Sequence, residues 1–191
     1  MSVQPIPEGY HTATPYLIVQ GAARAIDFYK SAFGATELMR MPGPGGCIMH
    51  AEIKIGDSPI MLADENPAHG AKSPHSFGGS PVGMMIYVTD VDTVFNQAVA
   101  AGAKVERPVQ NQFYGDRSGT VRDPFGHQWT VGTHIEDVPS DEMMRRFDEM
   151  MKNMPPPPAP PRKAPAKKAK KAPPKKKPAK AAKKPAKKKR R

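Results

Sequence analysis

A histidine and a glutamate lie two residues apart in the segment IMHAEIKI, where they are His50 and Glu52. The segment alternates apolar and polar residues from position 48 to position 55, which predicts a β-strand with both of these side chains on one face. An imidazole beside a carboxylate can transfer protons, or can bind a metal ion with ligands from elsewhere in the chain. An exposed sheet face with scattered polar groups gives the same pattern, and the residues alone favour neither interpretation.

A second concentration of polar side chains lies in the stretch FYGDRSGTVRDPFGHQWTV, residues 113–131. Alternation on both sides of Asp123-Pro124-Phe125-Gly126 predicts a β-hairpin, and these four residues fit a type I turn. The polar residues of the hairpin are Tyr114, Asp116, Arg117, Arg122, Asp123 and His127. A rigid hairpin so rich in charge is typical of a binding site, although a solvated turn has the same composition.

Strand alternation also assigns a direction to the side chains of both segments. The residues expected to face the core are Met49, Ala51, Ile53, Ile55, Val121, Trp129 and Val131. The residues expected on the opposite, polar faces are His50, Glu52, Lys54, Thr120, Arg122, Gln128 and Thr130.

The strands that carry these residues belong to an arrangement that occurs twice. The first half has expected strands at 15–19, 36–41, 48–55 and 60–63 and a helix at 21–33. The second half has expected strands at 82–88, 104–109, 113–122 and 127–133 and a helix at 91–101. Each helix ends at a glycine, Gly34 or Gly102, which suits a left-handed C-terminal cap. The shared βαβββ order predicts two half-sheets that each need the other to bury an apolar face.

The chain is expected to divide into four parts. These are a lead-in at 1–13, a domain at 14–139, a helix at 140–154 and a tail at 155–191. Within the domain, we expect module one at 14–64, a polar linker at 65–81 and module two at 82–139. The apolar stripe of the last helix is expected to pack on the sheet or on a second subunit.

Charge is divided unevenly between the domain and the tail. Residues 1–154 hold all 18 acidic residues, whereas residues 155–191 contain only Pro, Ala, Lys and Arg. Such a tail cannot bury apolar surface, so we expect it to be disordered. Dense lysine without aromatic residues suits phosphate backbones, which it binds through counterion release without reading bases. The tail therefore predicts association with nucleic acid, with RNA, an anionic membrane surface or a purely solubilising role as alternatives.

The remaining composition points to a soluble cytoplasmic protein. The single cysteine, Cys47, cannot form an internal disulfide, which fits a reducing compartment. The first residues, MSVQPIPEGYHTATP, lack the apolar core of a signal peptide, and no 18-residue apolar run that would span a membrane occurs. Binding of the tail to DNA would place the protein at the nucleoid.

Two pairs of segments resemble a known family. PYLIVQGAARAIDFYKSAFGA opens the first half and DPFGHQWTVGTHIEDV closes the second, and both resemble the vicinal oxygen chelate (VOC) superfamily of glyoxalases, bleomycin-resistance proteins and extradiol dioxygenases. HAEIKIGDSPIMLADE and FYGDRSGTVRDPFGHQW are similar to its PhnB-like branch. The resemblance covers residues 12–154. It implies an α+β fold in which two βαβββ modules form a cupped mixed sheet, and members often form homodimers.

The resemblance also implies where a metal would bind. The four strand positions that hold metal ligands in metal-dependent members fall here on Thr14, Met61, Gly83 and Thr130. Because none of these is a good ligand for a divalent metal, we expect no metal and no other cofactor. A displaced metal site, which would use His50 and Glu52 with His127 or His134, is the alternative.

Members without the metal bind a ligand between the half-sheets. The lining implied for this chain consists of Tyr16, His50, Glu52, Tyr87, Tyr114, Arg117, Arg122 and Thr130. The two arginines suit a carboxylate or phosphate group, although Arg122 alternatively pairs with Asp116 or Asp123. We therefore expect a protein that binds a small anionic molecule and carries a nucleic-acid-binding tail.

Two other functions fit the same residues. The first is a glyoxalase-type lyase, isomerase or transferase with His50 or Glu52 as the general base. The second is a dimeric nucleoid-associated protein that acts mainly through its tail.

Overall fold

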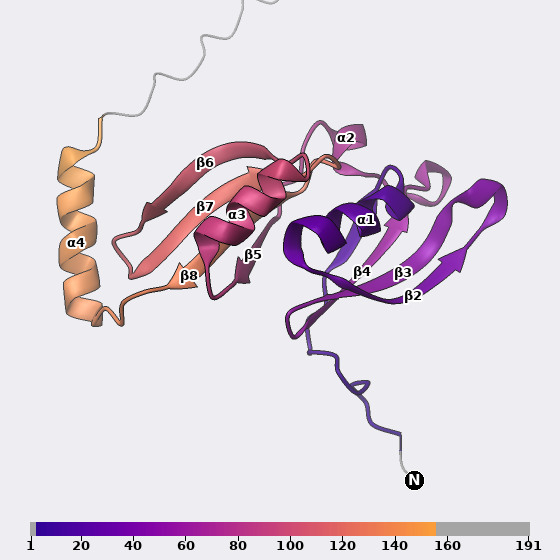
Figure 1. Cartoon of the computed structure of the whole chain (residues 1–191), viewed down its shortest axis with the longest axis horizontal. Helices are drawn as coiled ribbons and strands as arrows, with labels where there is room; N and C mark the ends of the chain where they lie inside the picture. Colours follow the sequence, from indigo (N-terminus) through magenta and orange to yellow (C-terminus); the bar gives the residue numbers. More distant parts are fainter. Residues whose placement is uncertain (1–2, 156–191) are drawn as a thin grey trace, which may run out of the picture. The chain divides into compact units, whose positions relative to one another are not determined.

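Two copies of one βαβββ unit follow each other along the chain (Figure 1). The computed structural model describes residues 3–155, so the predicted disorder of the tail lies outside the described residues. Module one contains β1 (Tyr16–Val19), α1 (Ala22–Phe33), β2 (Thr36–Pro42), β3 (Ile48–Ile55) and β4 (Ser58–Asp64). Module two contains β5 (Gly83–Tyr87), α3 (Val91–Ala100), β6 (Lys104–Asn111), β7 (Asp116–Arg122) and β8 (Gln128–His134). The predicted α+β fold with two such modules is confirmed.

Short helical segments occupy the connections. A 3₁₀ turn, η1 (Pro44–Gly46), lies between β2 and β3, and the predicted linker contains η2 (Pro67–His69) and α2 (Pro74–Phe77). The chain continues after β8 into α4 (Ser140–Asn153). None of the helices in residues 3–155 combines the length with the apolar composition that a membrane crossing requires.

Each module forms a mixed four-stranded sheet. The strand orders are β1-β4-β3-β2 and β5-β8-β7-β6. The first and last strands of each module pair in parallel, and the other neighbours pair antiparallel. Consequently β1 and β5 are both edge strands.

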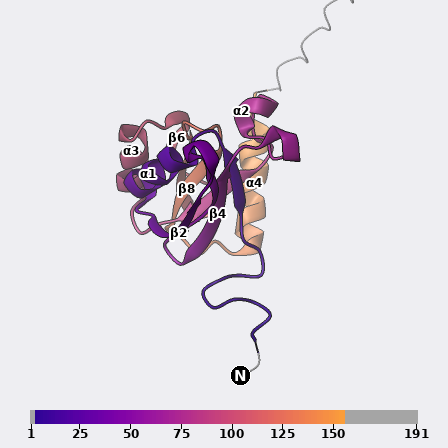
Figure 2. The same ribbon diagram turned by 90° about the vertical axis from the view of Figure 1, so that its right-hand side faces the viewer.

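The helices α1 and α3 lie on the same side of the two sheets (Figure 2) and pack against each other. The aromatic rings of α1 reach into module two, where Tyr29 and Phe33 lie 5.3 and 4.9 Å from Trp129 between ring centroids. One continuous core therefore joins the modules, in agreement with the expectation that neither half buries its apolar face alone.

The buried carboxylate of Asp123 fixes this junction. The predicted turn is present, with the Gly126 N–H donating to the Asp123 carbonyl at 3.1 Å. One carboxylate oxygen of Asp123 accepts the backbone N–H groups of Phe125 and His127, both at 2.9 Å. The other oxygen accepts the Trp129 indole N–H at 2.9 Å and the Tyr29 hydroxyl at 2.8 Å. Asp123, the first residue of the turn, therefore also binds side chains of the core.

The predicted directions of the strand side chains are confirmed with one exception. Met49, expected in the core, is 63% exposed, and Ile48 is buried in its place. Met41 pairs with His50 whereas Pro42 pairs with Ile48, so Met49 is the extra residue of a β-bulge. A bulge reverses the alternation on one side of it, which is why the prediction was wrong.

The amphipathic helix α4 has no buried residue. Its Phe147 ring lies 5.7 Å from that of Phe113, and its Arg146 pairs with Glu136 in the preceding connection at 2.7 Å. The apolar stripe is therefore exposed in a single chain. The sequence predicts that this stripe packs on the sheet or on a second subunit, and packing on a second subunit stays a prediction.

Candidate functional site

Module one brings a tyrosine, a histidine and a glutamate into one hydrogen-bonded chain. On β3, His50 Nε2 lies 3.1 Å from Glu52 Oε1, and His50 Nδ1 lies 3.0 Å from the hydroxyl of Tyr16 on β1. The Tyr10 hydroxyl of the lead-in donates to the second oxygen of Glu52. Tyr16 and Glu52 are both register partners of Met61 on β4, so this series of hydrogen bonds crosses the sheet over Met61. The predicted shared face of His50 and Glu52 is confirmed, and Tyr16 is their neighbour.

The hydrogen-bond partners assign the protons in this chain. The hydrogen bond from Tyr10 and, to a smaller extent, that from His50 lower the pKa of Glu52. Glu52 is therefore ionised at neutral pH and can only accept, so the proton between it and His50 belongs to Nε2. In the neutral imidazole, Nδ1 then carries a lone pair and accepts the Tyr16 hydroxyl.

Module two holds a different group around its exposed tyrosine. The Tyr87 hydroxyl donates to Asp116 Oδ2 at 2.8 Å, and His134 Nδ1 lies 2.8 Å from the other oxygen of this buried carboxylate. His134 Nε2 lies 3.1 Å from Asp137. The bond to Asp116 raises the pKa of Tyr87, and the bonds to Asp116 and then Asp137 raise the pKa of His134.

The two predicted anion-binding arginines are already paired with carboxylates. Arg117 binds Asp92 with two hydrogen bonds of 2.7 Å. Arg122 pairs with Glu106 of β6 and donates to the Gly126 carbonyl at 3.2 Å. Neither expected partner of Arg122 is used: the Asp123 carboxylate accepts four hydrogen bonds from other donors, and the Asp116 carboxylate is bonded to Tyr87 and His134.

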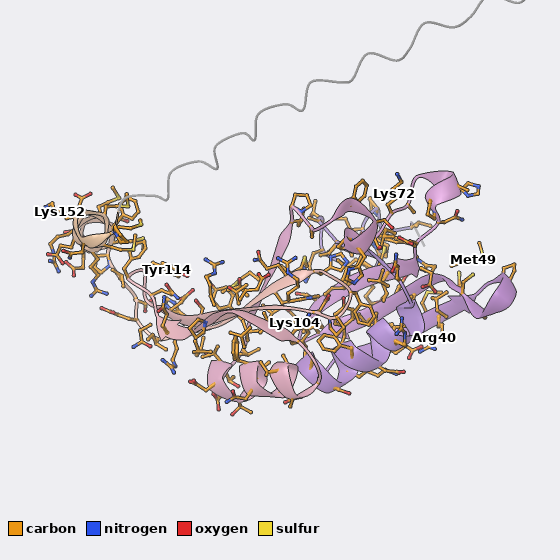
Figure 3. All side chains as sticks on the ribbon, turned by 90° about the horizontal axis from the view of Figure 1, so that it is seen from above. Arg40, Met49, Lys72, Lys104, Tyr114 and Lys152 are labelled. Atoms are coloured by element: carbon orange, nitrogen blue, oxygen red, sulfur yellow. The ribbon has the colours of Figure 1, made fainter. Side chains whose placement is uncertain are left out.

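A mostly apolar cavity of about 290 Å³, here called the junction cavity, lies between the edge strands β1 and β5 and the linker. Its lining is Pro15, Tyr16, Leu17, Ile18, Lys72, Pro74, Phe77, Gly79, Ser80, Pro81, Val82, Met84 and His127. His127 is buried, donates from Nε2 to the Ile18 carbonyl at 3.2 Å, and has a pKa lowered by that burial. Lys72 is the one lysine in this lining, and its ammonium lies 5.7 Å from the centre of the Phe77 ring. Figure 3 shows Lys72 on the side of the sheets away from α1 and α3.

The other predicted lining residues are distributed over separate hollows. Tyr87 lines a second space at the module junction, Tyr114 and Thr130 line a hollow over the second sheet, and Arg122 lines one beside the linker. Thr130 shares a hydrogen bond of 3.1 Å with Thr120. None of these hollows contains the whole predicted set.

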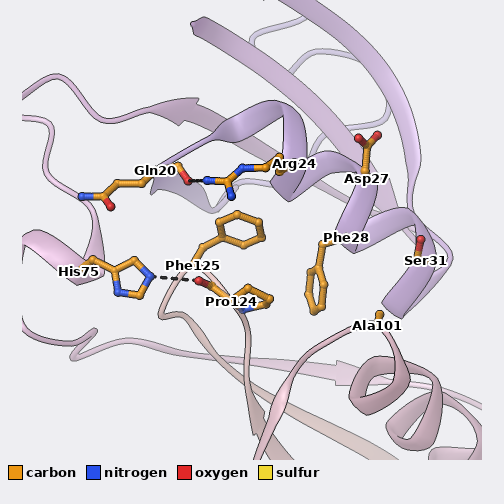
Figure 4. Close-up of a pocket in the computed structure, with 9 residues that line it drawn as sticks. All are labelled: Gln20, Arg24, Asp27, Phe28, Ser31, His75, Ala101, Pro124 and Phe125. Carbon is orange, nitrogen blue, oxygen red and sulfur yellow. Dashed lines mark hydrogen bonds between the residues drawn. The ribbon is translucent and has the colours of Figure 1, made fainter.

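A polar hollow of about 480 Å³ lies on the helix side of the molecule (Figure 4). Arg24 and His75 flank an aromatic floor of Phe28 and Phe125. Arg24 donates to the Gln20 carbonyl at 3.3 Å, and His75 Nε2 donates to the Pro124 carbonyl at 3.0 Å. Sequence patterns did not indicate this hollow, because its residues come from α1, the linker and the β7–β8 turn.

The residues at the four family metal positions do not fit a divalent metal. The Thr14 hydroxyl donates to the His11 carbonyl, Thr130 bonds Thr120, and Met61 and Gly83 provide no hard ligand. In residues 3–155, no three His, Cys, Asp or Glu side chains converge as a metal-binding group. Of the residues of the alternative displaced site, His50 and Glu52 share one hydrogen-bonded group, whereas His127 and His134 belong to two others.

Comparison with known proteins agrees with the fold. Residues 10–131 match the model of the glyoxalase/bleomycin resistance protein/dioxygenase superfamily. An uncharacterized protein of Mycobacterium tuberculosis H37Rv is 47% identical over 133 residues, which are 68% of this chain and 78% of the relative. The crystal structure of TioX from Micromonospora sp. ML1 is similar with a TM-score of 0.52 and 27% identity, over 68% of this chain and all of TioX. A PhnB protein from Bacillus cereus shares the fold, with a TM-score of 0.51 and 18% identity over 64% of this chain and 99% of its own. The chain therefore belongs to the glyoxalase/bleomycin resistance protein/dioxygenase superfamily.

Proposed function

We propose that this protein binds a small molecule with an apolar body and one anionic group in the junction cavity. The observation that carries the proposal is the lining of this cavity, which consists of apolar residues and glycine except for a lysine, a tyrosine, a serine and a neutral histidine. Ligand sites are typically concave and mostly apolar, with a few polar groups that fix orientation. The site lies between the two modules, as in the expectation drawn from the family.

The anionic group is assigned to Lys72 and not to the arginines predicted from the sequence. Arg117 and Arg122 already form bidentate or short ion pairs with carboxylates, so a ligand would have to displace those partners. Lys72 has no carboxylate partner among the described residues, and its ammonium lies over the Phe77 ring. A ligand carboxylate at the mouth of the cavity would gain a charge-assisted hydrogen bond there.

Phenylpyruvate is a suitable probe, because it joins an aromatic body to a carboxylate. We expect phenylpyruvate to bind more tightly than its uncharged methyl ester, and the Lys72→Met variant to lose most of this difference. A loss of about tenfold in affinity corresponds to one charge-assisted contact of about 1.4 kcal/mol. Titration followed by ligand-observed NMR measures both compounds against each variant.

Lys104→Met is the matched control, because Lys104 is an exposed lysine of β6 outside the junction cavity. Val82→Trp, at the cavity lining, is expected to abolish binding by filling the space. Equal affinity of the acid and the ester for the wild-type protein, or unchanged binding in Val82→Trp, would contradict the proposal.

We further propose that residues 155–191, which lie outside the described residues except for Pro155, bind nucleic acid. The support is their composition, in which 17 basic residues occur without an acidic one. If about ten of these charges contact duplex DNA, the affinity should fall with salt at a log–log slope near −9. Gel shifts of the full chain and of residues 1–154 at rising salt test this. Equal weak binding by both would refute a role of the tail, and DNA compaction without any response to a ligand would favour the nucleoid-associated alternative.

A further inference from the structure

We infer that Tyr16 is the group that transfers protons to and from a ligand in the junction cavity, with His50 as its base. The inference rests on the proposed function for the position of the ligand. It differs from the sequence prediction, in which His50 or Glu52 itself was the general base. Tyr16 both lines the cavity and donates to His50, whereas His50 and Glu52 do not belong to the cavity lining.

The geometry gives the phenol of Tyr16 an acceptor for its proton. His50 is held by Glu52 at 3.1 Å so that its free ring nitrogen, Nδ1, faces the Tyr16 hydroxyl at 3.0 Å. The Tyr10 hydroxyl donates to the other oxygen of Glu52, so the carboxylate is held with one oxygen facing His50. A hydroxyl, an imidazole and an orienting carboxylate in sequence form the arrangement that activates a nucleophile or a proton carrier in many enzymes.

Module two provides an internal comparison, because its edge strand β5 also carries a tyrosine, whose hydroxyl is bonded to a carboxylate and not to an imidazole. The Tyr87 hydroxyl donates to the carboxylate of Asp116, which is 3% exposed. A buried carboxylate that is already bonded to His134 holds the phenol in its protonated form, and the pKa of Tyr87 is accordingly raised. Two phenols of similar exposure, 48% for Tyr16 and 64% for Tyr87, are therefore expected to differ in reactivity.

The proton transfer balances without a cofactor. Tyr16 passes its hydroxyl proton to His50 Nδ1 while the phenol oxygen takes a proton from a ligand carbon next to a carbonyl. The electron pair of the broken C–H bond stays on the ligand as an enolate, and the imidazolium lies beside the ionised Glu52. Return of a proton to the same or another carbon restores all groups, so the overall reaction is an exchange or an isomerisation.

Acetylation by N-acetylimidazole tests the inference without a natural substrate. The Tyr16 oxygen attacks the acetyl carbon while the phenolic proton passes to His50. The bond from the acetyl carbon to the ring nitrogen of the reagent breaks, and the imidazolate that leaves takes a proton from His50 or water to become imidazole. We expect Tyr16 to be acetylated faster than Tyr87 although it is the less exposed of the two. His50→Asn keeps a hydrogen-bond acceptor near Nδ1 but cannot take the proton, so it should slow Tyr16 by about tenfold or more. Peptide mass spectrometry gives the rate at each tyrosine.

His134→Asn is the matched control, since it alters the histidine of the other group and should leave the rate at Tyr16 unchanged. Circular dichroism confirms that each variant is folded. The inference is overturned if Tyr16 reacts no faster than Tyr87, or if His50→Asn leaves its rate unchanged. If the role of His50 were only structural, His50→Asn would not slow the acetylation of Tyr16 selectively over that of Tyr87.

Phenylpyruvate separates this inference from the proposed function. Its C3–H bond is next to a carbonyl, and its exchange in D₂O is followed by NMR. We expect the wild-type protein to accelerate the exchange and Tyr16→Phe to remove the acceleration while phenylpyruvate still binds. Binding without accelerated exchange would overturn the inference alone, whereas absence of binding would overturn the proposed function.

Discussion

Replacement of Asp123 by Asn tests the claim that one buried carboxylate holds the two modules together. The carboxylate accepts four hydrogen bonds, two from backbone N–H groups of its own turn and two from the side chains of Tyr29 and Trp129. An amide offers one oxygen and one NH₂ group. Whichever way the Asn side chain turns, its NH₂ group faces two buried donors.

The expected loss of stability follows from this count. A buried donor left without an acceptor costs about 1–3 kcal/mol, so two of them predict a loss of about 3–6 kcal/mol for Asp123→Asn, once the lost charge is included. Tyr29→Phe removes one donor and leaves the carboxylate with three, so it should cost only about 1–2 kcal/mol. Burial and Asp123 both keep the Tyr29 hydroxyl protonated, because they raise its pKa.

Urea unfolding measures both losses. Trp129 is the single tryptophan of the chain and is completely buried, so its fluorescence reports the core that Asp123 supports. Circular dichroism checks that both signals give one transition with an unchanged dependence on urea. Asp57→Asn in the exposed β3–β4 turn is the control, with an expected change within about 0.5 kcal/mol. If Asp123→Asn is no more destabilising than Tyr29→Phe, the carboxylate does not hold the junction.

Three further predictions concern pH and assembly. The pKa of His134 is raised in the folded protein, so its protonation stabilises the fold. This stabilisation is complete below the unfolded pKa of about 6.5 and is lost as the pH rises through the folded pKa. His134→Asn should therefore destabilise the protein at about pH 5.5 and hardly at about pH 9. The pKa of His127 is lowered in the folded protein, so the unfolded chain binds this proton more readily. Acidification below about pH 6.5 should therefore destabilise the wild type more than His127→Gln. Urea titrations at several pH values measure the sign of the stability change for His134 and for His127. We also expect the exposed apolar stripe of α4 to pair with a second copy of the chain. The double variant Phe147→Glu with Met151→Glu should then convert a dimer to a monomer in sedimentation equilibrium, whereas Asp148→Lys on the polar face should not. A wild type that sediments as a monomer would refute the pairing.

Local patterns in the sequence were sufficient to predict the fold. Period-two and helical alternation located the strands and helices, and the predicted cap at Gly34 is present, with a φ of 67° and hydrogen bonds to the last turn of α1. The bulge at Met49 was missed because it depends on how β3 pairs with β2, and such pairing leaves no mark in a single strand.

The site was predictable only where its residues are neighbours in the chain. His50 and Glu52 lie two apart on one strand, so alternation placed them together. The partners of Tyr16, Arg117 and Arg122 come from other elements, and composition cannot choose among several carboxylates at long range. The junction cavity was expected between the modules, but its lysine lies in the linker, which has no periodic pattern to indicate a direction.

The turn at Asp123 and the junction cavity are parts of one structural unit, which joins the stability of the fold to its proposed function. His127 donates its backbone N–H to Asp123 and its ring Nε2–H to the Ile18 carbonyl of β1, and it lines the cavity. The carboxylate that organises the core therefore also fixes a wall of the cavity against the strand that carries Tyr16. Loss of this carboxylate should release His127 from the turn before it affects the chain of Tyr16, His50 and Glu52, whose contacts lie within module one and its lead-in. Folded Asp123→Asn protein is accordingly expected to bind phenylpyruvate more weakly while its Tyr16 keeps a fast rate of acetylation, and a parallel loss of both properties would show that the two sites are not separable.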